Sequence, residues 1–235
     1  MDVDFWLDGV TATIIVAFGL ISSIIFLVKY KNTKAELLRH FAYISPLAGL
    51  LYLGVCLDFW FVLLQNENLP NSWGQVALLS YIWFPPLMYF IINFNLDMLN
   101  VEKKKKILLP FILVSIVYYI LIFQDPFTAF YMESPETPGE GLIDYNSSLE
   151  SAAGLILALL FIPILLYLAL LFFKKGMKAS GVIKRKLLLL AGACILFCIG
   201  GIGEGLTIPG GLLILVRIAY IGSFVLLFYG FRSRE

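Results

Sequence analysis

Long apolar stretches separated by short polar breaks are the main pattern in this sequence. A helix that crosses a bilayer needs about 20 consecutive, mostly apolar residues. The chain supplies such stretches repeatedly, and they predict an all-α polytopic membrane protein, a seven-helix bundle that forms one domain over residues 1–235. The expected helices lie at about residues 9–29, 38–64, 73–99, 107–123, 152–173, 186–206 and 212–231, with one long outer loop at 124–151.

The charges of the polar breaks predict how the bundle is oriented. Sixteen of the 17 Lys and Arg residues lie in alternate breaks or at the C-terminus, and the seventeenth is Arg217. Short loops rich in Lys and Arg stay in the cytoplasm. The N-terminus is therefore expected outside and the C-terminus in the cytoplasm. The first eight residues carry three Asp and no Lys or Arg, so the first stretch is expected to remain as a helix and not to be a cleaved signal peptide.

Composition agrees with this pattern. Hydrophobic residues make up 60% of the chain and charged residues 14%, whereas soluble domains are about 45–50% apolar and about 25% charged. We expect an integral protein of the plasma membrane with no room for a soluble catalytic domain. No Ser/His/Asp set, paired catalytic carboxylates or metal motif is found, so we expect no enzyme activity, no cofactor, no metal and no nucleic-acid partner.

Several predicted helices contain proline, which removes a backbone donor. Lipid-embedded helices tolerate this when neighbouring helices supply hydrogen bonds to the freed carbonyls. The adjacent Pro85 and Pro86 are expected to bend the third helix.

Three ionisable residues lie inside apolar stretches at similar expected depth: Asp58, Glu204 and Arg217. An unpaired charge in the bilayer is unfavourable by roughly 2.5–3.5 kcal/mol, so these groups are expected to meet inside the bundle. The cluster is either a ligand or ion site open to the outside, or a two-state latch, or a structural ion pair that fixes helix register. The glycines around Glu204 do not predict a phosphate-binding loop, because no predicted strand precedes them. The Gly201–Gly205 spacing favours close contact between helices instead.

A second polar group is expected at the cytoplasmic end. Tyr89, Asn93 and Asp97 share one helix face, while Arg39 and His40 open another helix at the same level. We expect Asp97 to contact Arg39. The group is either the inner half of a relay or a solvated helix terminus.

The cytoplasmic lysines are interpreted in two ways. They set the topology, or they also contact anionic lipid or an acidic partner. The residues concerned are Lys103, Lys104, Lys105, Lys106, Lys174, Lys175, Lys184, Arg185 and Lys186. On the opposite side, Asn146 begins a short glycosylation sequon. The loop around it either folds back as a lid or is disordered in its acidic second half.

Two segments resemble a known family. YIWFPPLMYFIINF in the third helix is similar to the aromatic, Pro-centred third helix of the seven-helix sensor region found at the N-terminus of many histidine kinases. QDPFTAFYMES looks like the outer segment of that region. The resemblance implies a sensor, but the chain stops four residues after Phe231, without a kinase domain.

Together these observations predict a stand-alone, receptor-like membrane sensor. It would bind a ligand or partner from the outer side and signal through a separate cytoplasmic or membrane protein. A small transporter or channel is the first alternative, since intramembrane charges also line pathways. A structural subunit or assembly factor of a membrane complex is the second.

Overall fold

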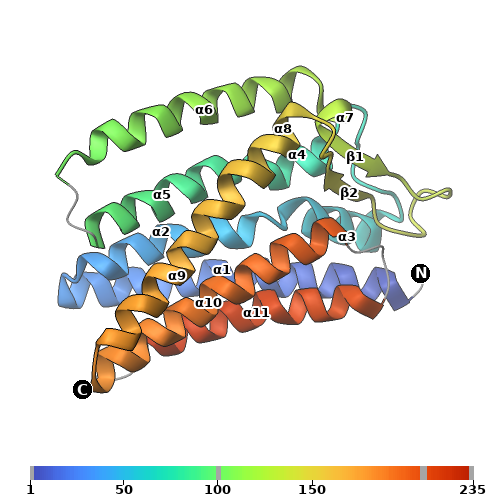
Figure 1. Ribbon diagram of the computed structural model, residues 1–235. Helices are drawn as coiled ribbons and strands as arrows, with labels where there is room; N and C mark the ends of the chain where they lie inside the picture. The colour runs from blue at the N-terminus through green and yellow to red at the C-terminus, as the bar shows by residue number, and fades with distance from the viewer. Residues whose placement is uncertain (1–2, 99–101, 207–210, 233–235) are drawn as a thin grey trace. The chain divides into compact units, whose positions relative to one another are not determined.

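The computed structural model describes residues 3–98, 102–206 and 211–232 (Figure 1). The chain divides into two compact units, Met1–Ile156 and Leu157–Glu235. The boundary lies inside the predicted fifth helix, and each unit is considered by itself below.

The described part of the first unit is a set of helices that lie side by side (Figure 1). They are α1 (Val3–Thr33), α2 (Glu36–Leu50), α3 (Leu53–Gln65), α4 (Gln75–Tyr81), α5 (Phe84–Met98) and α6 (Lys104–Gln124). The predicted spans at 38–64 and 73–99 are each broken into two helices. The break between α2 and α3 bends the chain by 50°.

Two hydroxyl groups compensate for prolines inside the helices of the first unit. Pro46 removes the donor that would bond the Ala42 carbonyl, and Ser23 of α1 donates to that oxygen at 2.7 Å. Pro86 likewise frees the Ile82 carbonyl, which accepts from the Tyr119 hydroxyl of α6 at 2.8 Å. Neighbouring helices thus replace the lost bonds.

The predicted outer loop folds into a small cap, which we define as residues 125–148. It contains α7 (Pro126–Ala129), β1 (Phe130–Glu133) and β2 (Asp144–Ser147). The strands pair antiparallel, with Phe130 opposite Ser147 and Glu133 opposite Asp144. Asp125 caps α7, and hydrogen bonds from the Thr128 side chain and backbone N–H lower the pKa of its carboxyl. This two-stranded sheet is the departure from the all-α prediction within the described ranges.

The second unit begins with η1 (Leu157–Phe161), a π-helical segment that follows α8 (Ala152–Ile156) of the first unit. It continues as α9 (Ile162–Lys178), α10 (Gly181–Leu206) and α11 (Gly211–Arg232), which pack as consecutive antiparallel pairs. The glycines of α10 make close helix contact with α11 at Gly200, Gly201 and Gly203, and a Cβ at Gly201 would lie 3.2 Å from the Tyr220 hydroxyl oxygen. A Cβ at Gly200 would overlap the Tyr220 ring of α11, and one at Gly203 would overlap Val216. Gly205 lies outside the residues whose side chains are described.

Among the described residues, five helical segments are by length and composition able to cross a membrane, or six if the bent pair α2–α3 counts as one span. The protein is thus helical with several candidate membrane spans. In α11 the apolar stretch Ile214–Gly230 is shorter than the others. The seventh span and the orientation stay predictions. Exposed apolar side chains follow α6 at Leu109, Leu113, Val117 and Ile120, as expected for a face turned to lipid.

Candidate functional site

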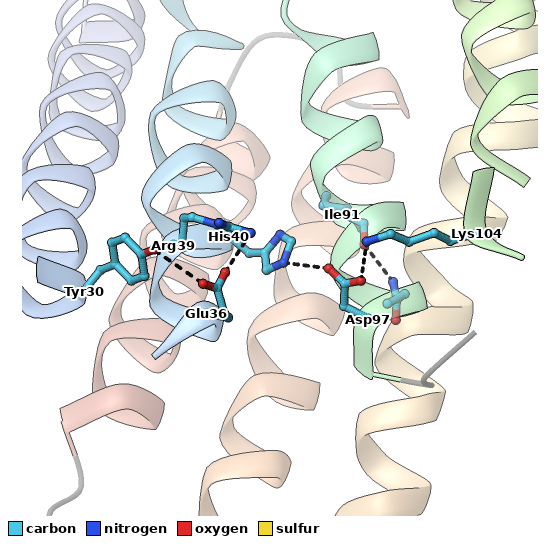
Figure 2. Close-up of polar contacts among 8 residues, drawn as sticks. Tyr30, Glu36, Arg39, His40, Ile91, Asp97 and Lys104 are labelled. Atoms are coloured by element: carbon cyan, nitrogen blue, oxygen red, sulfur yellow. Dashed lines mark hydrogen bonds and ion pairs between the residues drawn. The ribbon is translucent and has the colours of Figure 1, made fainter. Parts of the chain in front are cut away.

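The end of the first unit farthest from the cap holds a cluster of polar side chains from four helices (Figure 2). We define this polar cluster as Tyr30 of α1, Glu36, Arg39 and His40 of α2, Asp97 of α5 and Lys104 of α6. Asp97 lies at its centre. Its carboxylate is 3.1 Å from His40 Nε2 on one side and 2.7 Å from Lys104 Nζ on the other.

The two partners of Asp97 differ in their surroundings. The side chain of His40 is 6% exposed, whereas those of Asp97 and Lys104 are 37% and 41% exposed. An ionised carboxylate only accepts hydrogen bonds, so His40 donates the proton on Nε2. The His40 ring also meets the edge of the Phe94 ring at 5.6 Å between centroids. One carboxylate therefore joins a buried imidazole to a solvated ammonium.

Short sequence separations explain the other contacts of the polar cluster. Arg39 pairs with Glu36 at 2.7 Å, three residues earlier on α2. The Tyr30 hydroxyl donates to Glu36 at 3.4 Å across the turn between α1 and α2. The sequence analysis expected Arg39 to contact Asp97, but Arg39 pairs within its own helix and Lys104 takes the place beside Asp97. Such an i, i+3 pair is favoured because both side chains lie on one helix face.

Two residues predicted for this group lie apart from it. Tyr89 packs its ring against Phe90 at 5.5 Å between centroids, and Asn93 is partly buried on α5. Within the described ranges, no hydrogen bond joins either of them to the polar cluster. His40 and Asp97, which were expected at one level, are in contact, whereas the contacts of Glu36 with Tyr30 and Arg39 were not predicted.

At the other end of the first unit, Asp58 of α3 clamps the cap. Its side chain is fully buried, and its carboxylate accepts hydrogen bonds from the backbone N–H of Leu69 at 2.7 Å and of Ile143 at 2.8 Å. The Asn68 amide donates to the same carboxylate at 3.1 Å and to the Gly141 carbonyl at 2.8 Å. The loop after α3 and the strand-connecting segment of the cap are therefore held to one buried carboxylate.

The expected contact of Asp58 with Arg217 and Glu204 stays a prediction. Asp58 belongs to the first unit, where the described hydrogen bonds to its carboxylate come from amides. Arg217 is buried on α11 of the second unit. Glu204 lies on α10, and its side chain is outside the described residues. The amide donors to Asp58 could not be predicted from the sequence, apart from the polar break that contains Asn68.

A second set of hydrogen bonds joins the cap to α4. The Ser80 hydroxyl lies 2.6 Å from the Tyr145 hydroxyl of β2 and accepts from the Gly54 backbone N–H at 2.9 Å. The Tyr81 hydroxyl accepts from the Ser147 backbone N–H at 3.1 Å. The Tyr81 ring stacks on Phe130 of β1, with centroids 4.6 Å apart. The strand that carries Asn146 is thus attached to the helix that leads to α5.

The lysines named from the sequence fall at three helix ends. Lys104 belongs to the polar cluster, while Lys103, Lys105 and Lys106 are exposed around the start of α6. The others lie at the end of α9 and the start of α10. Among the described residues, no group of three or more His, Cys, Asp or Glu side chains could hold a metal ion.

Replacing each of the two partners of Asp97 in turn should lower the unfolding free energy by unequal amounts. Replacing His40 by alanine removes a buried ring and its hydrogen bond, and we expect unfolding free energy to fall by about 2–3 kcal/mol. Replacing Lys104 by glutamine breaks a half-exposed ion pair, worth under about 1 kcal/mol. Thermal unfolding of the purified protein in detergent measures both, with Lys105→Gln as the exposed control. Equal effects, or the reverse order, would contradict this account of the polar cluster.

Searches against protein-family models, curated proteins and solved structures found no match for this chain.

Proposed function

We propose that this protein is a membrane sensor without enzymatic activity. In this proposal the chain crosses the membrane seven times, with the cap outside and the polar cluster in the cytoplasm, as the distribution of Lys and Arg predicts. A ligand or partner acts on the cap, and a separate cytoplasmic or membrane protein recognises the state of the polar cluster.

One observation carries the proposal: a single interrupted span connects the two sites. The span Gln75–Asp97 comprises α4 and α5. Its first helix is bonded to the cap through Ser80 and Tyr81, and its last turn carries Asp97, which pairs with His40 and Lys104. A displacement of β2 would therefore act on the same span that presents the carboxylate.

In this proposal the span adopts two arrangements that differ at its interruption. At Pro86 the helix lacks a backbone donor, and one hydroxyl from α6 satisfies the freed carbonyl. Breaks of this kind are common hinge points in helices. At the far end, Asp97 exchanges one of its partners without leaving a buried charge unpaired, because it is partly exposed. Such an ion pair is suited to report a small movement of α5.

Coupling between the two ends can be measured without knowing the ligand. Asn68→Ala weakens the attachment of the cap, and Asp97→Asn weakens the polar cluster. Distant, independent sites give additive changes in stability within about 0.3–0.5 kcal/mol. For a sensor we expect the double variant to deviate from additivity by at least about 1 kcal/mol. Chemical unfolding of the four proteins of this cycle gives the value.

A control cycle combines Asp97→Asn with Asp125→Asn. Asp125 is an exposed carboxylate that caps α7 and does not contact α3 or α4 through any described bond. This pair should be additive. Additivity in both cycles would remove the basis for signal transfer along α4–α5. If only the control cycle is additive, mass spectrometry of proteins co-isolated with the wild type but not with Asp97→Asn identifies the signalling partner.

A small transporter is the second candidate, and the two broken spans favour it. The α2–α3 break and the α4–α5 break lie beside each other, because Gly54 and Ser80 are hydrogen-bonded. Transporters often place substrate where discontinuous helices meet. Flux of labelled amino acids, sugars or ions into proteoliposomes, lost on Ser80→Ala, would support transport and displace the sensor proposal.

A further inference from the structure

The turn between α9 and α10 presents six cations within a short distance along the chain. We define the basic hairpin as residues 174–186. Lys174, Lys175 and Lys178 lie in the last turns of α9, and Lys184, Arg185 and Lys186 lie in the first turns of α10. Gly181 turns the chain with φ of 59°. Gly176 of α9 packs against Leu187 and Leu188 of α10, which brings the two helix ends together.

The charge of the basic hairpin is not balanced along its own sequence. No Asp or Glu occurs between residues 151 and 203. Two cations of the first unit have carboxylate partners, because Lys104 pairs with Asp97 and Arg39 pairs with Glu36. Setting topology needs only cationic residues on one side. The five hairpin cations other than Lys175 also create a positive potential that attracts an anion.

Exposed apolar side chains lie among these cations and indicate what kind of anion fits. Met177 is 55% exposed, Val182 38% and Ile183 64%. Two candidate spans, Ala152–Lys178 and Gly181–Gly203, meet at this turn. The turn therefore lies at a membrane surface if these spans cross the bilayer. Apolar side chains enter the boundary between headgroups and acyl chains there, while lysines reach the phosphates.

We infer that the basic hairpin binds the headgroup phosphates of anionic phospholipids, with Met177 and Ile183 inserted among the acyl chains. The inference is independent of the proposed sensor function. It assigns to the hairpin a lipid partner, in place of an acidic soluble protein, because a charged protein surface offers no apolar phase for these side chains.

Lipid binding to the purified full chain tests the inference. Delipidated protein in nonionic detergent is titrated with phosphatidylglycerol or phosphatidylcholine, and native mass spectrometry counts bound lipid. Each surface cation contributes about fivefold to the binding of anionic lipid. The wild type should therefore bind phosphatidylglycerol at least about tenfold more tightly than phosphatidylcholine. The triple variant Lys174→Gln, Lys178→Gln, Arg185→Gln should lose most of this preference.

The matched control removes three charges elsewhere, in Lys103→Gln, Lys105→Gln, Lys106→Gln, and should keep the preference. Equal losses in both triple variants would show unspecific charge attraction and overturn the inference. Displacement of phosphatidylglycerol by inorganic phosphate at millimolar concentration would also overturn it, because the site would then hold a free anion. The single variants Lys174→Gln and Arg185→Gln give graded losses if the triple variant folds poorly.

The apolar contribution is tested separately by Met177→Ser combined with Ile183→Ser. We expect weaker binding of both lipids with the preference for phosphatidylglycerol retained. If binding of neither lipid changes while an acidic peptide such as polyglutamate binds the hairpin, the lipid assignment is wrong.

Discussion

Replacing Asp58 by alanine is expected to lower the unfolding free energy by about 3–5 kcal/mol. The carboxylate is fully buried and accepts from the N–H groups of Leu69 and Ile143 and from the Asn68 amide. Alanine leaves these donors without an acceptor in a site closed to water. Each buried donor that loses its acceptor is unfavourable by about 1–3 kcal/mol.

Two measurements follow this change. Thermal unfolding in detergent should shift down by about 10 °C, given about 2–4 °C per kcal/mol for a chain of this size. Limited proteolysis should cut the segment that connects β1 and β2, because its Ile143 anchor is lost. Asp58→Asn keeps the shape of the side chain but places an NH2 group against the N–H donors that surround it. The unfolding free energy of this variant should therefore lie between those of the wild type and Asp58→Ala.

Asp125→Asn is the matched control for the Asp58 variants. Asp125 is also a cap-side aspartate that accepts backbone and side-chain hydrogen bonds, both from Thr128, but it is exposed. Asparagine is itself a good helix cap, so we expect a change of less than about 1 kcal/mol. If Asp58→Ala were as mild as Asp125→Asn, the buried carboxylate would not be what holds the cap.

The prolines show which part of the fold the sequence could predict. A proline inside an apolar stretch predicts a freed carbonyl and a neighbouring donor, and both occur at Pro46 and Pro86. The sequence could not say that Ser23 and Tyr119 would be the donors. Hydroxyl residues occur on several helices, and only the packing of α1 on α2 and of α6 on α5 selects among them.

The candidate sites show a similar division. His40 and Asp97 could be placed at one level from helix lengths alone. The pairing of Arg39 with Glu36 could not be predicted, because Glu36 and Asp97 were both expected within reach of Arg39. Glu36 is favoured because a partner on the same helix requires less ordering of side chains. Asp58 was recognised as a buried charge that needs partners. A cation was the expected partner, whereas the described partners are amides of two loops. The path of a loop cannot be predicted from the spacing of its apolar residues.

Gly54 is the position where the smallest substitution should have the largest effect on helix packing. It lies two residues after the α2–α3 break, where α3 begins against α4. A Cβ at Gly54 would overlap the backbone carbonyl of Val76, and it would lie 2.9 Å from the Ser80 hydroxyl oxygen. A flexible side chain could move away, but a helix backbone moves only with its whole helix.

We therefore expect Gly54→Ala to lower the unfolding free energy by more than about 3 kcal/mol, at the upper end for overpacked sites. Separation of α3 from α4 also lengthens the hydrogen bond from Gly54 to Ser80. Ser80→Ala removes that hydrogen bond together with the one to Tyr145, and its effect should be about 1–2 kcal/mol. The loss of stability in Gly54→Ala beyond that of Ser80→Ala is therefore a lower bound on the cost of the backbone overlap.

Gly230→Ala is the control, because a Cβ there would make ordinary contacts with Leu189 and Leu190 at 3.6 Å. Alanine is a better helix former than glycine by about 0.5–1 kcal/mol, so this variant should be neutral or more stable. The monodisperse fraction on gel filtration and the unfolding midpoint report all three variants. If Gly54→Ala resembled Gly230→Ala, α3 and α4 would not approach as closely as the contact between Gly54 and Val76 requires.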